Sequence, residues 1–98
     1  MSNINNVDTV PDYINKFIVN NEEGIKKIYN EEKSQRGDGF IYININVKEN
    51  KLDLIYLTNG QKNNVGTDDE TLNKLLVNDK ILIMIDDNEY KTRFIIYI

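Results

Sequence analysis

The side chains with which this chain could do chemistry are carboxylates, lysines, tyrosines and hydroxyls, because its 98 residues include no histidine and no cysteine. Histidine is the commonest general base and metal ligand, and the cysteine thiolate is the usual sulfur nucleophile, so sites of both kinds are excluded. Without cysteine the chain also has no disulfide framework. Any catalytic site would have to be built from carboxylates, lysine, tyrosine, serine or threonine.

The acidic residues stand in four clusters, each of which has a structural explanation. They are Glu22-Glu23, Glu31-Glu32, Asp68-Asp69-Glu70 and Asp86-Asp87 with Glu89. A glycosidase-type site needs two carboxylates held across a cleft, which adjacent acids on short surface elements do not provide. The last cluster suggests oxygen ligands for a hard cation, but it lacks the spacing and central glycine of a calcium-binding loop. We therefore predict no catalytic, cofactor-binding or metal-binding residues, and a protein that is not an enzyme.

The acidic balance of the chain restricts its partners. The net charge is −4 and the pI is near 4.7. Nucleic-acid binding needs a basic stripe that neutralises phosphates, and docking on an anionic membrane needs basic residues as well. We therefore predict a protein partner or a homo-oligomer, and neither nucleic acid nor membrane.

Composition and apolar runs bear on where the protein works. The longest apolar runs, Ile81–Ile85 and Phe94–Ile98, are far shorter than the roughly 20 residues that cross a bilayer. The first ten residues lack the basic and apolar regions of a signal peptide. The sequence is rich in asparagine, isoleucine, lysine and aspartate and has no alanine, which indicates a low-GC genome. Bacteria, phages and other viruses are among the sources of such genomes. We expect a cytoplasmic protein, in the host cytoplasm if it is viral.

The N-terminal part combines a polar tail with a helix start. Residues 1–9 are predicted to be a flexible tail, since they are polar and rich in asparagine. Thr9 has the place of an N-cap, and Asp12 three residues later gives a pattern like a capping box.

The helical spacing that follows allows two interpretations. One long helix covers about 10–34, or the chain breaks near Asn20-Asn21 and a second helix begins there. Because Gly24 would cost about 1 kcal/mol inside a helix, we favour the break.

The rest of the chain is predicted to form four strands and one short helix. The strands are 40–47, 52–58, 80–86 and 90–98, and the helix covers about 68–77. Short connections pair the strands as two hairpins. Strands and helices do not alternate one to one, so the fold class is α+β: one or two N-terminal helices followed by ββαββ, with a four-stranded, largely antiparallel sheet and the helices packed on one face. Residues 10–98 form a single domain.

The predicted sheet has two unequal faces, because successive strand residues point to opposite sides. The first face is almost wholly aliphatic and is the expected core. The second face mixes apolar and aromatic residues with asparagine, lysine and arginine, a composition enriched at interfaces. Either a helix crosses this second face and buries it, or the face is exposed and binds a partner.

From the second interpretation we predict a small acidic protein–protein interaction module, a regulator, inhibitor or subunit. Its predicted partner-binding residues are Phe40, Tyr42, Leu57, Leu82, Met84, Arg93 and Tyr97. Two alternatives stay open. One is a self-assembling structural protein that uses its C-terminal strand edge, for example as a homodimer. The other is a small-ligand binder or enzyme with a carboxylate or tyrosine site.

Overall fold

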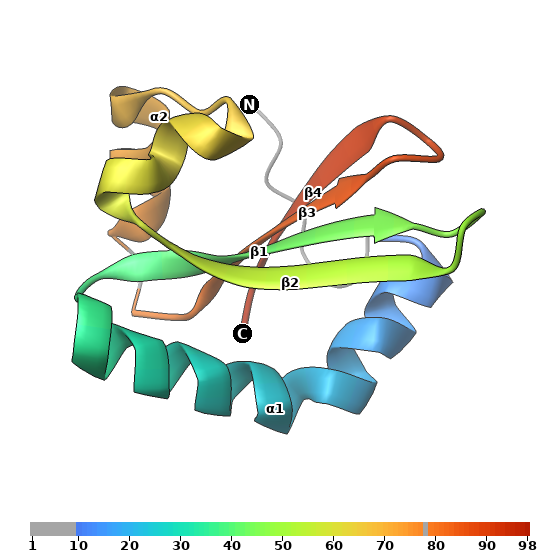
Figure 1. The fold of residues 1–98 in the computed structure, drawn as a ribbon, viewed down its shortest axis with the longest axis horizontal. Coiled ribbons are helices and arrows are strands. Elements are labelled where there is room, and N and C mark those ends of the chain that lie inside the picture. The colour runs from blue at the N-terminus through green and yellow to red at the C-terminus, as the bar shows by residue number, and fades with distance from the viewer. Residues whose placement is uncertain (1–9, 78) are drawn as a thin grey trace.

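A computed structural model describes residues 10–77 and 79–98 of the chain. Its elements are α1 (Asp12–Arg36), β1 (Gly39–Asn46), β2 (Lys51–Thr58), the 3-10 helix η2 (Asn59–Val65), α2 (Asp69–Leu76), β3 (Leu82–Asp87) and β4 (Thr92–Tyr97). The α+β class is therefore confirmed (Figure 1). The predicted tail, residues 1–9, and the predicted cap at Thr9 lie outside the described residues.

The N-terminal helix α1 is continuous over 25 residues, so the favoured break near Asn21 is wrong. Ile18 and Ile25, on either side of that point, are buried against the same sheet. Their packing outweighs the cost of about 1 kcal/mol that Gly24 brings to a helix interior. The Asn21 amide does not cap a new helix but donates to the carbonyl of Phe17, at 2.8 Å. Figure 1 shows the helix curving beneath the sheet.

The four strands form one mixed sheet in the order β2-β1-β3-β4. Both predicted hairpins are present and antiparallel, but β1 and β3 pair in parallel at the centre of the sheet. The prediction of a largely antiparallel sheet is thus correct only for the hairpins. Strand β2 returns the chain to the end of the sheet at which β1 begins, and η2 and α2 lead from there to the far side of β1, so β3 runs parallel to β1.

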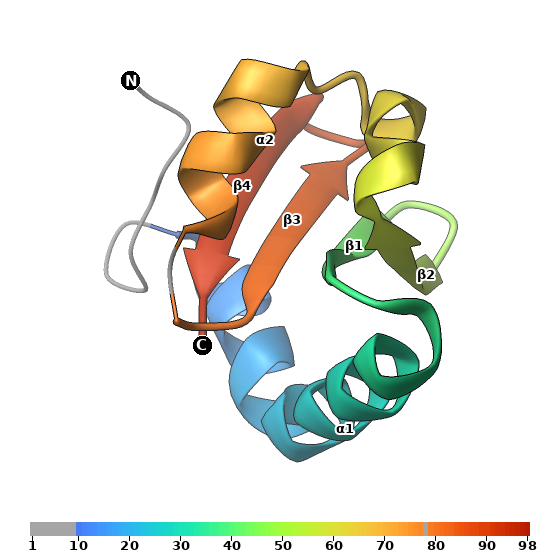
Figure 2. The ribbon, with the colours of Figure 1, turned by 90° about the vertical axis from the view of Figure 1, so that its left-hand side faces the viewer.

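Helices cover both faces of the sheet, which corrects the prediction that they pack on one (Figure 2). The first face meets α1, and the second meets η2 and α2. The first core contains Val10, Ile14, Ile18, Ile25, Ile41, Ile43, Ile45, Tyr56, Ile83, Ile85 and Ile96. The second core contains Phe40, Leu57, Val65, Leu72, Leu75, Leu82, Met84 and Ile95. The division of strand residues between an aliphatic and a mixed face is confirmed, because the hairpin registers keep the predicted parity.

The short helix α2 begins as its sequence indicates. The Asp68 carboxylate accepts a hydrogen bond from the Thr71 N–H at 2.7 Å, and this bond lowers the pKa of Asp68. Leu72 and Leu75 then point toward the second face and are buried there. A helix of this length is marginal alone, so its packing on the sheet supplies most of its stability.

A buried carboxylate at the end of β3 ties the first helix to the second hairpin. Asp87 is only 1% exposed. Its Oδ1 accepts from the N–H groups of Glu89 and Tyr90 at 3.0 and 3.2 Å, and its Oδ2 accepts from the Tyr13 hydroxyl. Burial and the adjacent Asp87 raise the pKa of Tyr13 well above its usual value. Asp87 therefore fixes both the hairpin turn and the start of α1.

We predict that Asp87→Ala lowers the free energy of unfolding by about 3 kcal/mol in urea denaturation. Hydrogen bonds to charged groups contribute about 1.5–3 kcal/mol each, and two turn N–H groups and one hydroxyl lose their acceptor. The control is Asn88→Ala, an exposed residue of the same turn, which should change stability by less than about 0.5 kcal/mol. Equal losses in the two variants would contradict the role given to Asp87.

Candidate functional site

The partner-binding residues predicted from the sequence divide into a buried set and a half-buried set. Phe40, Leu57, Leu82 and Met84 are 0%, 3%, 2% and 0% exposed. They lie in the second core beneath α2, so they present no surface to a partner. The expectation of an exposed mixed face is thus wrong for this half of the face, because Leu72 and Leu75 of α2 cover it.

Tyr97 anchors the helix that covers this half. It is half-buried, and its hydroxyl donates to the carbonyl of Leu75 at 3.1 Å. That carbonyl lies in the last turn of α2, where carbonyls lack a partner within the helix. Burial raises the pKa of Tyr97, which keeps the hydroxyl protonated as a donor. Tyr97 thus serves the attachment of α2.

The remaining two residues, Tyr42 and Arg93, both bind the carboxylate of Asp86. The Arg93 guanidinium binds it in a two-pronged pair, with Nε–Oδ1 at 2.5 Å and Nη2–Oδ2 at 3.0 Å. The Tyr42 hydroxyl donates to Oδ2 at 2.9 Å. The three residues come from β1, β3 and β4, side by side on the second face.

Arg93 also reaches across to the segment between η2 and α2. Its Nη2 donates to the Val65 carbonyl at 2.6 Å, and its Nη1 to the Thr67 hydroxyl at 3.3 Å. The guanidinium therefore connects the sheet with the chain that leads into α2. Both oxygens of Asp86 accept hydrogen bonds, so this cluster acts as a structural tie between the sheet and the chain that leads into α2.

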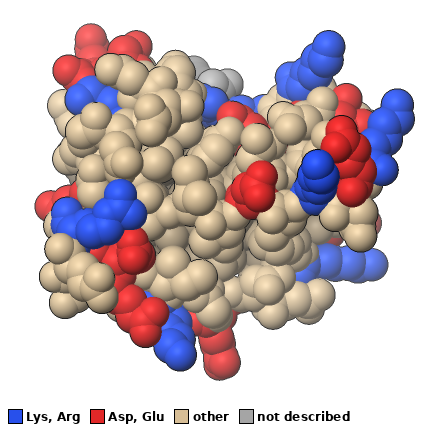
Figure 3. Space-filling view, in the orientation of Figure 1, with Lys and Arg blue, Asp and Glu red and all other residues tan. Residues whose placement is uncertain are grey.

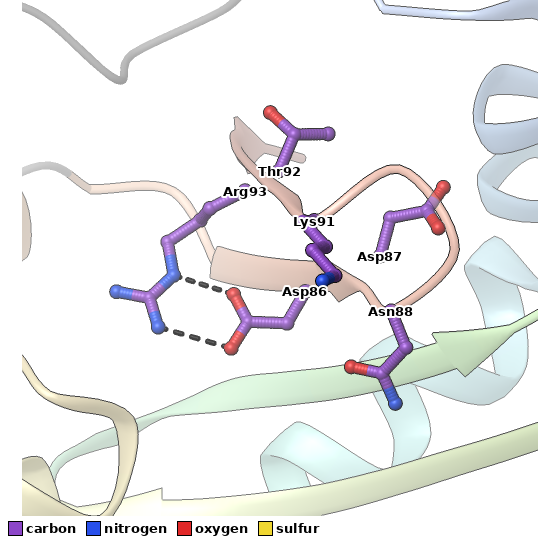
Figure 4. Close-up of a pocket in the computed structure, with 6 residues that line it drawn as sticks. All are labelled: Asp86, Asp87, Asn88, Lys91, Thr92 and Arg93. Carbon is purple, nitrogen blue, oxygen red and sulfur yellow. Dashed lines mark hydrogen bonds and ion pairs between the residues drawn. The ribbon is translucent and has the colours of Figure 1, made fainter.

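The environment of the tie shifts the acidity of its members. Burial, the hydrogen bond to Asp86 and the negative charge of Asp86 raise the pKa of Tyr42 to about 12, although Arg93 opposes this effect. The hydrogen bonds to Asp86 raise the pKa of Arg93, so that the guanidinium stays charged. An open hollow of about 510 Å³ lies beside the pair at the β3–β4 turn, lined by Asp86, Asp87, Asn88, Lys91, Thr92 and Arg93 (Figure 4).

The edge strand β2 is capped over only half its length. Its outer edge accepts a hydrogen bond at the Tyr56 carbonyl, from Arg36 at 3.2 Å, and donates one from the Thr58 N–H, to Gln61 at 3.1 Å. In an antiparallel pair, alternate residues turn their backbone groups to the same side. The backbone groups of Leu52 and Leu54 therefore also point away from β1.

We call residues 51–55 the free β2 segment. Within the described part of the chain, no hydrogen bond is found to the outward backbone groups of Leu52 and Leu54. The side chains of Leu52, on the first face, and Ile55, on the second, are 45% and 46% exposed. Neither α1 nor α2 covers this corner of the sheet. Exposed edge groups beside exposed apolar side chains form a template for another strand.

A second open hollow, of about 570 Å³, follows the free β2 segment. It is lined by Tyr42, Asn44, Leu52, Asp53, Leu54 and Ile55. The Asn44 Oδ1 is buried there and has no hydrogen-bond partner among the described residues. A buried carbonyl of this kind costs free energy unless an N–H or O–H group reaches it. The hollow thus has an apolar wall, beside which lie the Asp53 carboxylate and the buried Asn44 oxygen.

The surface over this edge carries few charges. Strand β2 lies at the front in Figure 1, and Figure 3, in the same orientation, shows a largely uncharged surface there. Charged side chains of both signs gather at the end that carries the β1–β2 turn. Among the residues described, no group of three or more acidic side chains is placed to hold a metal ion. No helix of the described chain is both long and apolar enough to cross a membrane.

Of the predicted site residues, only Tyr42 lines the hollow beside the free β2 segment. Period-two alternation along the strands puts Asn44, Asp53 and Ile55 on the mixed face and Leu52 on the aliphatic face, but it does not mark them as site residues. These residues could have been found only by knowing which strands lie at the edges of the sheet, and the sequence pattern does not show that.

Comparison with known proteins gives no relative, since no family model, no curated protein and no solved structure matches the chain.

We predict that Arg93→Met loosens α2 more than the rest of the fold. The variant loses the tie to Val65 and Thr67 and leaves the Asp86 carboxylate with Tyr42 alone. Amide hydrogen exchange should show lower protection in α2 with that in α1 kept, and the free energy of unfolding should fall by about 2 kcal/mol.

The matched control is Lys91→Met, an exposed basic residue of the same hairpin, which should change neither quantity. Arg93→Lys should fall between the two, because lysine keeps the charge and loses the two-pronged geometry. Uniform loss of protection across α1 and α2 would argue against a local tie.

We also predict that Tyr42 makes folding sensitive to alkaline pH. A tyrosine in the unfolded chain titrates near pH 10, whereas the pKa of Tyr42 in the fold is about 12. Between these values the unfolded state releases a proton that the folded state retains, so the free energy of unfolding falls as pH rises from 10 to 12. Tyr42→Phe should lose less stability over that interval than the wild type, measured by urea denaturation at each pH. Equal losses would show that Tyr42 is not the titrating group.

Proposed function

We propose that the protein is a non-enzymatic protein-binding module that takes up an extended segment of its partner along the free β2 segment. The proposal is carried by the outward backbone groups of Leu52 and Leu54, which have no hydrogen bond within the described part of the chain, beside the exposed Leu52 and Ile55 side chains. Addition of a strand to a sheet edge is a recurring mode of peptide recognition.

The geometry divides the task between backbone and side chains. The partner's backbone bonds to the outward N–H and C=O groups of β2, which supplies affinity with little dependence on sequence. Alternate side chains of an added strand point to opposite faces. On the second face they enter the hollow beside Tyr42 and Asn44, and on the first they meet Leu52, so both faces contribute to selectivity.

The capped half of the edge limits the length of the bound segment. Arg36 and Gln61 already bond the edge groups of Tyr56 and Thr58, so a partner strand has to stop before Tyr56 or displace them. Short pairing of this kind favours a weak, reversible complex over a permanent one. That suits a regulator or an exchangeable subunit.

Self-assembly through β4 is a second candidate, because β4 is the other edge strand of the sheet. Two of its side chains, Arg93 and Tyr97, are bonded to the segment before α2 and to α2 itself. The β2 edge has more accessible apolar surface, so we place the interaction there.

The proposal is tested by selecting random peptides displayed on phage against the immobilised wild-type chain and measuring the enriched peptides by fluorescence anisotropy. Ile55→Glu places a charge in the hollow and should weaken binding by at least about tenfold. Val19→Glu is the matched control, since Val19 is a β-branched residue 65% exposed on α1, away from the edge. It should leave binding unchanged.

A second pair of variants separates the backbone from the side chain. Leu52→Pro removes an outward N–H and is tolerated at an edge strand, whereas Leu52→Ala keeps that N–H and shortens the side chain. Strand addition predicts a larger loss for Leu52→Pro. Peptides that bind these variants and Ile55→Glu as tightly as the wild type, or a selection that enriches none, would refute the proposal.

A further inference from the structure

The charges on the free β2 segment suit a particular partner. Lys51 and Asp53 lie two residues apart on the second face, on either side of Leu52. Lys51 makes an exposed ion pair with Glu49, at 3.5 Å, and pairs of this kind contribute little. No salt bridge to Asp53 is found among the described residues. The segment thus carries one positive and one negative group, both accessible.

We infer that the occupant of the free β2 segment is the same segment of a second copy, paired antiparallel about a two-fold axis at Leu52. This inference rests on the proposed function and names its partner. The axis places Leu52 opposite Leu52 of the second copy, with both backbone bonds exchanged between them. It also places each Lys51 directly opposite an Asp53, once on either side of the axis.

The alternative registers are less favourable for reasons present in the structure. An axis at Asp53 would set the two Asp53 carboxylates directly opposite each other, and like charges so placed are destabilising. An axis at Leu54 would pair Leu52 with Tyr56, whose carbonyl is bonded to Arg36. An odd shift is excluded, because directly opposed residues must both direct their backbone groups toward the other strand or both away from it. With the axis at Leu52, the outward backbone groups of the two strands face each other and opposite charges lie directly across the axis.

The expected contact is small, so the dimer should be weak. Few backbone bonds form before the capped part of β2 is reached on one side and the β1–β2 turn on the other. Contacts well below the standard interface size belong to transient complexes. We therefore expect a dissociation constant in about the micromolar to millimolar range.

The first experiment is analytical ultracentrifugation of charge-reversed chains over a concentration series. The wild type should associate with increasing concentration. Lys51→Glu and Asp53→Lys should each weaken association by about tenfold, because each places two like-charged pairs across the axis. A mixture of these two single variants should regain wild-type association, as should the double variant, since opposite charges then face each other again.

The second experiment fixes the register by cross-linking, and the absence of cysteine makes it clean. Under mild oxidation Leu52→Cys should form a disulfide-linked dimer, because directly opposed residues that exchange backbone bonds have Cα atoms about 5.5 Å apart. Ile55→Cys is exposed to the same degree, but in this register it lies about 20 Å from its equivalent. It should not cross-link, and neither should Val19→Cys.

The outcomes separate this inference from the function on which it rests. Association that survives charge reversal and Leu52→Pro, or equal cross-linking through Ile55→Cys, overturns the register and the pairing. If the chain stays monomeric at every concentration, the inference that a second copy is the partner is wrong. If selected peptides still bind the wild type and lose affinity with Leu52→Pro, the protein-binding function stands with a different partner.

Discussion

Strand β1 lies at the centre of the sheet, and the apolar side chains on each of its two faces have to be buried by a different element. It pairs with β2 antiparallel on one side and with β3 in parallel on the other. Ile41, Ile43 and Ile45 point to one face and Phe40 to the other, and all four are buried. Strand β2 returns the chain to the end of the sheet at which β1 begins, and η2 and α2 then lead to β3 on the other side of β1. The segment that joins β2 to β3 therefore also carries the helix that covers Phe40.

The helix that covers the second face is short, so part of that face remains exposed beyond its ends. Helix α2 has 8 residues and buries its two inward leucines over one half of the face. Two polar attachments hold it: Tyr97 binds its last turn, and Arg93 binds the segment that leads into its first turn. Beyond Arg93 the face is open, so the structural tie and the candidate site adjoin each other. Tyr42 belongs to both, since its hydroxyl meets Asp86 and its ring lines the hollow beside β2.

Free sheet edges are a hazard that proteins reduce with bulky covers and charges. Here Arg36 at the end of α1 and Gln61 in η2 cap the second half of the outer edge of β2. The first half carries Lys51 and Asp53, yet also exposed Leu52 and Ile55. When such a segment pairs antiparallel with a second copy of itself, each Lys51 faces an Asp53, so the two copies attract each other. These charges can therefore do more than reduce aggregation: they can favour one partner and one register of pairing.

The sequence by itself determined the local elements and the assignment of residues to faces. Period-two alternation in both hairpins and helical spacing in the first third of the chain depend on neighbours along the chain, which a sequence displays directly. It also determined that a short helix follows Asp68, and it excluded histidine and cysteine chemistry. The break expected near Asn21 does not occur, because the burial of Ile18 and Ile25 against the sheet outweighs the local cost of Gly24.

Only the tertiary structure decided which strands lie at the edges, which face α2 crosses and which part of that face stays open. These depend on contacts between residues far apart in the chain, such as Arg93 with Val65 and Arg36 with Tyr56. Nothing in the local pattern of Phe40 or Met84 distinguishes a residue buried under a helix from one exposed on a binding face. The candidate site therefore lies at the uncovered end of the mixed face and at the edge beside it, because exposure depends on what packs above a residue and not on the residue itself.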